Sequence, residues 1–219
     1  MKTRILSTLF LFVGSLAAMA ANPADLIRLY EDEILAHDLY VALGKMHPDI
    51  MPLQNIPHSE ARHRKMMAEV LKAEGIEIPK AVDGKRFVSE GLDATFAQWL
   101  AEGSKSPADA CRVGTRLEDH DIAELRKAQI DFPRHKEILS ALESASHNHF
   151  RAFHRNLTSR GGKYKAEALP AAEIRKILTS ENQCGGCGGA CNAEETKPSG
   201  QGNGKGQGRG KGRRYRGGP

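Results

Sequence analysis

Six side chains able to bind a metal ion fall on the faces that four amphipathic segments should bury. The first segment carries one acid, the second an acid and an imidazole, the third two acids and the fourth an imidazole: Glu33, Glu60, His63, Glu118, Asp121 and His149. An unpaired ion taken out of water costs several kcal/mol, which is a large part of the roughly 5 to 15 kcal/mol of net stability of a domain. A bound cation would offset that cost, so the pattern predicts a metal site.

Glu60 and His63 taken alone are only weak evidence for a metal site. A spacing of three residues places both side chains on one helical face, but Glu-x-x-His also arises by chance. A surface pair, or a carboxylate held by Arg62 or Arg64, would explain the same residues. The agreement of four segments favours the metal site, and a buried polar network without an ion is the alternative. Seven further histidines fall mostly off these faces and are expected at the surface: His37, His47, His58, His120, His135, His147 and His154.

Four long helices should carry the six residues. Asn22-Pro23 and Ser106-Pro107 each combine a capping side chain with proline at the first helical position, and Gly75 and Gly161 are typical of helix ends. The predicted long helices span about residues 23–46, 53–74, 107–130 and 134–160, and short amphipathic helices are expected at 93–102 and 171–178.

The lengths of the connections predict the topology. The links between helices one and two and between helices three and four are short, whereas about thirty residues separate helix two from helix three. Short links make antiparallel neighbours, and one long crossover distinguishes the ferritin-like arrangement from a simple up-down bundle. The sequence therefore predicts an all-α, ferritin-like four-helix bundle over residues 21–180, with the long crossover between helices two and three and short accessory helices.

Two segments resemble the first half of the di-iron site of ferritins, bacterioferritins and rubrerythrins. These are residues 33–40 and residues 60–63. Other phrases are still more similar to an uncharacterised ferritin-like branch described only as a domain of unknown function, namely residues 31–33, 36–38, 59–63 and 148–153. The resemblance covers residues 25–179.

The resemblance implies a role for each ligand. Glu33 would be a terminal ligand of a first metal, His63 its nitrogen ligand, and Glu60 a bridge to a second metal. Glu118 and His149 would bind that second metal.

One position departs from the family pattern. Helix four should offer an acid three residues before His149, but Ser146 stands there, so the second bridging carboxylate is absent. Asp121, one turn beyond the helix-three ligand, is expected to replace its charge in part, and Tyr40 is expected to hydrogen-bond a ligand carboxylate. A mononuclear site therefore remains an alternative to a dinuclear one.

The ligand types indicate which metals fit. Carboxylates and imidazole favour iron or manganese and also accept zinc. In the di-iron interpretation the protein oxidises its metal or reduces peroxide, with oxygen or peroxide as the small partner. The alternative is a non-enzymatic envelope scaffold or metal-sequestering protein.

The N-terminus is expected to direct export. Lys2 and Arg4 precede an apolar run at residues 5–18, and Ala18-Met19-Ala20 offers small residues at the cleavage positions. This pattern is typical of a secretory signal peptide over residues 1–20, and the run is short for a membrane span. The mature chain is expected to begin near Ala21 in the periplasm or outside the cell.

Three thiols follow the predicted bundle. Cys184, Cys187 and Cys191 lie in the glycine-rich segment 181–191 and could bind a soft metal ion or form one disulfide. Cys111 falls on a predicted core face and is expected to be a small buried hydrophobe.

The basic character of the chain is concentrated in its last segment. The formal net charge is +5, and residues 192–219 hold seven Lys or Arg and two Glu among many glycines. Such a composition predicts a disordered tail with affinity for an anionic envelope surface. The near-neutral remainder gives no sign of specific nucleic-acid binding, and the oligomeric state is left open.

Overall fold

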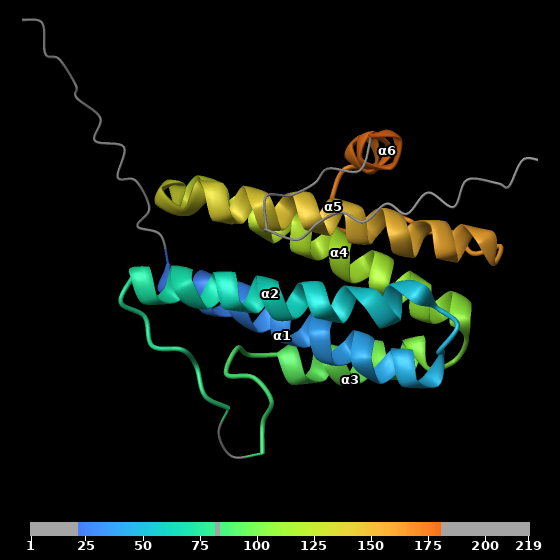
Figure 1. The fold of residues 1–219 in the computed structure, drawn as a ribbon, viewed down its shortest axis with the longest axis horizontal. Coiled ribbons are helices and arrows are strands. Elements are labelled where there is room, and N and C mark those ends of the chain that lie inside the picture. Colours follow the sequence, from blue (N-terminus) through green and yellow to red (C-terminus); the bar gives the residue numbers. More distant parts are fainter. Residues whose placement is uncertain (1–21, 82–83, 181–219) are drawn as a thin grey trace, which may run out of the picture. The chain divides into compact units, whose positions relative to one another are not determined.

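The computed structural model describes residues 22–81 and 84–180, and all regular structure in these ranges is helical (Figure 1). The elements are α1 (Pro23–Met46), α2 (Met51–Ala73), α3 (Leu92–Gly103), α4 (Pro107–Asp131), the 3-10 helix η1 (Pro133–His135), α5 (Lys136–Ser159) and α6 (Ala171–Thr179). No described helix combines the length and the apolar character that a bilayer crossing requires. The predicted export signal, cysteine segment and basic tail lie outside the described residues.

Capping side chains fix where two of the long helices begin. The Asn22 Oδ1 atom accepts a hydrogen bond of 3.1 Å from the N–H of Ala24, and the Ser106 Oγ atom accepts one of 3.1 Å from the N–H of Asp109. These bonds satisfy N–H groups that have no partner within the helix. The helices α1 and α4 thus begin at the prolines that the sequence indicates.

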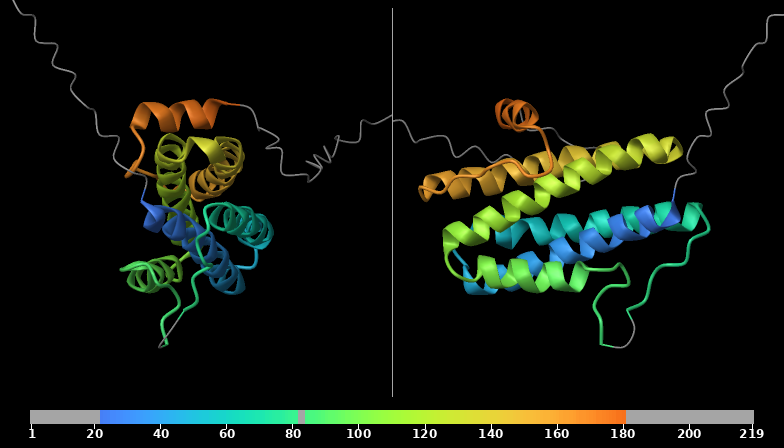
Figure 2. Two further views of the ribbon diagram at one scale, coloured as in Figure 1. Left: turned by 90° about the vertical axis from the view of Figure 1, so that its left-hand side faces the viewer. Right: turned by 180° about the vertical axis from the view of Figure 1, so that it is seen from behind.

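The long helices pack in two pairs. α1 lies along α2, and α4 lies along α5; α1 also contacts α4, and α2 contacts α5 (Figure 1). The connection from α2 to α4 contains α3, which packs against α1 and α4. α6 crosses the outer side of α4 and α5 (Figure 2), where Ile174 and Ile177 join a cluster with Ile122 and Phe150.

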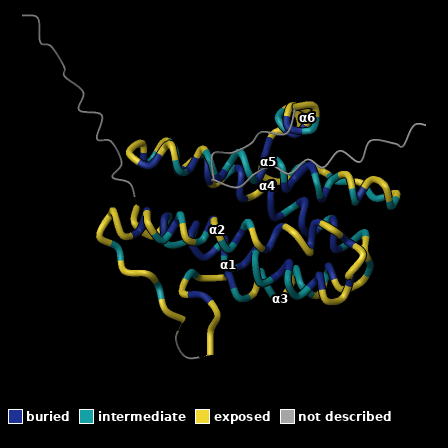
Figure 3. Tube along the Cα trace, viewed as in Figure 1, coloured by how far each residue is buried: buried dark blue, intermediate teal, exposed yellow. Residues whose placement is uncertain are grey.

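Two apolar layers fill the interior, and a polar layer separates them. One layer includes Leu35 of α1 and Phe153 of α5, and the other includes Leu26 of α1 and Leu142 of α5. On each of the four long helices the buried acids and imidazoles fall in sequence between residues of these two layers. Figure 3 shows the buried faces turned inward. The polar side chains are therefore enclosed at both ends by hydrocarbon.

A glycine allows two aromatic rings to meet beside the polar layer. A Cβ atom on Gly114 would lie 2.6 Å from the ring of Phe153. Without that atom, Phe153 packs against Tyr40 with 4.8 Å between ring centroids. The glycine therefore helps to set the position of the Tyr40 ring.

Two of the histidines that were expected at the surface are buried instead. His47 is 9% exposed, and its Nε2 atom lies 2.9 Å from the carbonyl oxygen of Gly103. His135 is 7% exposed, and its Nε2 atom lies 2.6 Å from a carboxylate oxygen of Glu74. The expectation was wrong because both partners come from other elements, which helical periodicity does not reveal.

Candidate metal centre

All six candidate ligands are buried in the polar layer. None is more than 9% exposed: Glu33, Glu60, His63, Glu118, Asp121 and His149. Helix α1 supplies one of them, α2 two, α4 two and α5 one. The periodicity that places them on inner faces therefore brings residues from all four long helices into one layer.

Glu60 occupies the middle of this cluster. Its Oε2 atom lies 2.9 Å from Nδ1 of His63, and its Oε1 atom lies 2.9 Å from Nδ1 of His149. The two imidazole rings are nearly parallel, with centroids 5.4 Å apart. Each oxygen of one carboxylate thus faces a different imidazole.

Two further carboxylates flank these imidazoles. Glu33 Oε2 lies 3.4 Å from Nδ1 of His63, and Glu118 Oε1 lies 3.6 Å from Nδ1 of His149. We define the first half of the centre as Glu33 and His63, and the second half as Glu118 and His149. Glu60 joins the two halves.

Three buried atoms in the cluster lack hydrogen bonds in the described part of the chain. They are Oε1 of Glu60 and Nδ1 of both His63 and His149. Ligand atoms of these three residues all lie within 4.8 Å of one another, a grouping that could hold a metal ion. Buried polar atoms normally have hydrogen-bond partners, whereas these three have only ion-pair contacts within the cluster, as donors around a cation would.

Comparison with known proteins places the chain in a family. The model of the "Uncharacterized protein domain (DUF2202)" matches residues 23–181, which include all six candidate ligands. The chain belongs to the DUF2202 family. This DUF2202 protein is similar to Uncharacterized protein MJ0754 of Methanocaldococcus jannaschii, with 31% identity over 163 residues that cover 73% of this chain and 88% of the relative.

A solved structure is similar to the DUF2202 chain as well. The crystal structure of hypothetical protein MJ0754 from Methanococcus jannaschii superposes with a TM-score of 0.68 at 30% sequence identity. The superposition covers 74% of this chain and 93% of that one. The similarity therefore extends over nearly the whole relative.

Burial and neighbouring charge act in opposite directions on the acids of the DUF2202 centre. Burial raises the pKa of Glu33 to about 8, and it also raises the pKa of Glu118 and of Asp121. Burial would raise the pKa of Glu60 too, but the two flanking imidazoles outweigh it and hold that pKa well below its usual range. Glu60 is thus the carboxylate that the cluster keeps ionised most strongly.

Nearby carboxylates also shift the pKa values of the two imidazoles. Burial would lower the pKa of His149, but the charges of Glu60 and Glu118 raise it to about 10. The pKa of His63 is raised well above its usual value in the same way by Glu60 and Glu33, against burial. A metal ion would have to displace the protons that these rings hold.

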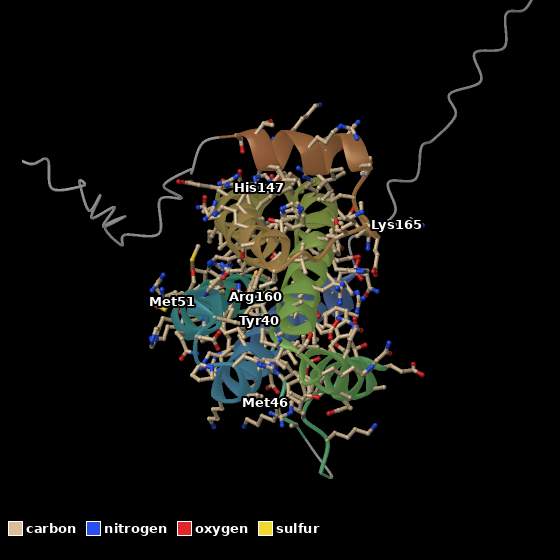
Figure 4. All side chains as sticks on the ribbon, turned by 90° about the vertical axis from the view of Figure 1, so that its right-hand side faces the viewer. Tyr40, Met46, Met51, His147, Arg160 and Lys165 are labelled. Carbon is tan, nitrogen blue, oxygen red and sulfur yellow. The ribbon has the colours of Figure 1, made fainter. Side chains whose placement is uncertain are left out.

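Two hydroxyl groups bond carboxylates of the cluster. The Tyr40 hydroxyl donates to Oε1 of Glu118 over 2.7 Å, and its ring lies in the interior between the helices (Figure 4). The Ser146 hydroxyl donates to Oδ2 of Asp121 over 2.5 Å. Ser146, which stands on α5 where an acid was expected, therefore binds Asp121, the additional acid of α4.

Asp119 is a buried acid that sequence reasoning missed. Its carboxylate accepts bonds from the Tyr164 hydroxyl and from three backbone N–H groups, those of Glu167, Ala168 and Leu169. The residue faces away from the centre although it follows a candidate ligand directly. It fixes the segment that leads into α6, and no pattern in the sequence signals that role.

Glu31 was missed for a similar reason. Its two carboxylate oxygens accept bonds of 2.7 and 2.8 Å from the N–H groups of Val88 and Ser89. These bonds hold the segment before α3 against α1.

Cys111, in contrast, is a buried free thiol, as predicted.

Proposed function

We propose that this DUF2202 protein is a ferritin-like metal-binding protein that holds two ions of iron or manganese in its polar layer. The observation that carries the proposal is the placement of Glu60, whose two oxygens face the Nδ1 atoms of His63 and His149 at 2.9 Å each. A carboxylate between two nitrogen donors is the arrangement expected of a bridging ligand. The dinuclear form is favoured over the mononuclear one because both halves repeat the same carboxylate and imidazole donors.

Charge balance supports two divalent ions. The centre holds the buried carboxyl groups of Glu33, Glu60, Glu118 and Asp121. If all are ionised, two divalent cations and neutral imidazoles bring the total charge to zero. Without metal, protons would hold buried acids neutral, as the raised pKa values of Glu33, Glu118 and Asp121 indicate, and two divalent ions would displace those protons.

The packing of the helices supports the ferritin-like part of the proposal. Two antiparallel pairs with one long connection are the topology of that class, and the most extensive helix contacts here are those of α1 with α2 and of α4 with α5. Ser146 replaces the acid that a second bridge would need. We propose that Asp121 supplies the negative charge of that missing acid, and the Ser146 hydroxyl holds Asp121 in place.

The donor set also suits redox chemistry. Iron or manganese bound there would supply one-electron chemistry toward oxygen or peroxide, whereas zinc would fit the donors without that activity. The two apolar layers close the centre at both ends. The Tyr40 hydroxyl fixes the orientation of Glu118.

Metal content tests the proposal directly. The mature chain would be titrated anaerobically with iron(II) or manganese(II), freed of excess metal and analysed, and peroxide would then be added to the iron-loaded sample. We expect about two ions per chain and a change in the visible spectrum on oxidation. A stably folded chain that takes up neither metal would refute the proposal and favour the scaffold.

Export and surface attachment are further parts of the proposal. The charged and apolar pattern of residues 1–20 supports removal of a signal peptide near Ala20, and the seven basic residues of 192–219 support binding to an anionic envelope surface. Mass measurement of the protein from its own cells should show a chain beginning at Ala21. Surface binding should weaken in moderate salt, and binding that resists salt would contradict the electrostatic account.

A further inference from the structure

A cavity of about 380 Å³ opens beside the centre, between α1, α3 and α4. Its walls include Asp32 of α1, Thr95 and Trp99 of α3, and Glu124 and Asp121 of α4. Glu124 is exposed, whereas Asp121 is 9% exposed. The cavity therefore leads from solvent to a buried carboxyl group of the polar layer.

Asp121 belongs both to this cavity and to the charge cluster of the centre. The charges of Glu33, Glu118 and Glu60 all contribute to its electrostatic environment. Its Oδ2 atom accepts the Ser146 hydroxyl, and within the described ranges no hydrogen bond reaches its Oδ1 atom. One oxygen of a nine-tenths buried carboxyl group thus remains open for a ligand.

The other acids of the cavity differ in how they are held. Both Asp32 oxygens accept bonds from Nε of Arg28, at 2.9 and 3.0 Å. Glu124 makes no ion pair with any residue in the described ranges. The outer part of the cavity therefore presents one carboxylate that is free to attract a cation.

We propose that this cavity is the route by which a hydrated divalent cation reaches the centre, with Glu124 as the attracting charge and Asp121 as the first ligand inside. The inference rests on the proposed function. The volume fits such an ion, because six waters at about 30 Å³ each occupy roughly 180 Å³. The apolar layers close the centre at both ends, so an opening through the side of the helix bundle supplies the access.

The rate of metal uptake tests the route separately from the capacity for metal. Cobalt(II) is a suitable probe because its visible absorption strengthens when protein ligands replace water. Stopped-flow mixing with cobalt(II) would compare Glu124→Gln, which removes the free charge, with Thr95→Trp, which fills the cavity. All chains would carry Cys184→Ser, Cys187→Ser and Cys191→Ser, because those thiols would bind cobalt themselves. Glu69→Gln is the matched control, since Glu69 is an exposed acid on α2 away from the cavity.

The route predicts slower loading at unchanged capacity. Glu124→Gln should load about threefold more slowly at low ionic strength, with the difference shrinking in salt. Thr95→Trp should lose the fast loading phase, and Glu69→Gln should load as the unmodified chain does. Unmodified rates in both cavity variants would overturn the route while leaving the metal centre intact. An unmodified chain that binds no cobalt would overturn the centre and the route together.

Discussion

The two halves of the centre contain the same ligand types, but different hydrogen bonds hold those ligands in place. In each half a carboxylate lies beside an imidazole whose Nδ1 atom is 2.9 Å from an oxygen of Glu60. In the first half, Nε2 of His63 lies 3.2 Å from the Ser59 hydroxyl of the same helix. In the second half, the Tyr40 hydroxyl of α1 bonds Glu118 of α4. The second half therefore depends on contacts between helix pairs, and the first half does not.

Asp121 adds a second difference between the two halves. Asp121 lies on the same helix as Glu118, and it also lines the cavity that opens to solvent. On α1 the acid that lines the cavity is Asp32, next to Glu33, and both of its oxygens are held by Arg28. We expect the second half to gain and lose metal faster than the first.

The largest effect should come from Glu60→Ala, because this residue serves both halves. The variant should lose most of its metal in either half, whereas Glu69→Ala on the exposed side of α2 should keep the full amount. Metal analysis after dialysis gives the comparison. Full occupancy in Glu60→Ala would reassign the centre.

Loss of one imidazole should affect one half. His63→Ala and His149→Ala should each reduce the bound metal by about one ion, because each removes the only nitrogen donor of its half. Spectroscopic titration with cobalt(II) would count the remaining ions. Equal and complete loss in both variants would show that the halves do not bind independently.

A smaller effect is expected from Tyr40→Phe, which removes a single hydrogen bond to Glu118. Removing a partner that orients a ligand typically weakens metal affinity by roughly tenfold or more. Competition with a chelator should show that weaker binding for one ion and an unchanged affinity for the other. A uniform weakening of both would contradict the assignment of Tyr40 to the second half.

Asp119→Ala should leave the metal content unchanged and lower stability. The substitution deprives the Tyr164 hydroxyl and three backbone N–H groups of their acceptor, at a cost of about 1–3 kcal/mol for each donor that stays buried. Urea unfolding would measure that cost, and metal analysis of the folded variant would supply the control. A loss of metal here would mean that the α6 segment supports the centre.

Helical periodicity explains why much of the interior could be predicted. Residues spaced by three and four share a helical face. The inward orientation of Glu33, Glu60 and Glu118 could therefore be predicted from the apolar pattern of the helix that carries each of them. Capping residues such as Asn22 and Ser106 likewise act within a few residues of the chain. Both kinds of feature are local, and a single sequence contains them.

Features that depend on contacts between distant segments could not be predicted. Asp119 bonds a segment that lies about fifty residues later, with separations of 45 to 50 along the chain. His47 and His135 are buried by partners on other elements. The cavity is likewise formed by three helices together, so only the folded arrangement reveals it.

Anomalous diffraction from crystals of the manganese-loaded or iron-loaded chain tests the central claim most directly. The account predicts two peaks, one on each side of the Glu60 carboxylate, with Glu33 and His63 near one and Glu118 and His149 near the other. A folded chain with no peak in the polar layer, or with metal only at its surface, would contradict it.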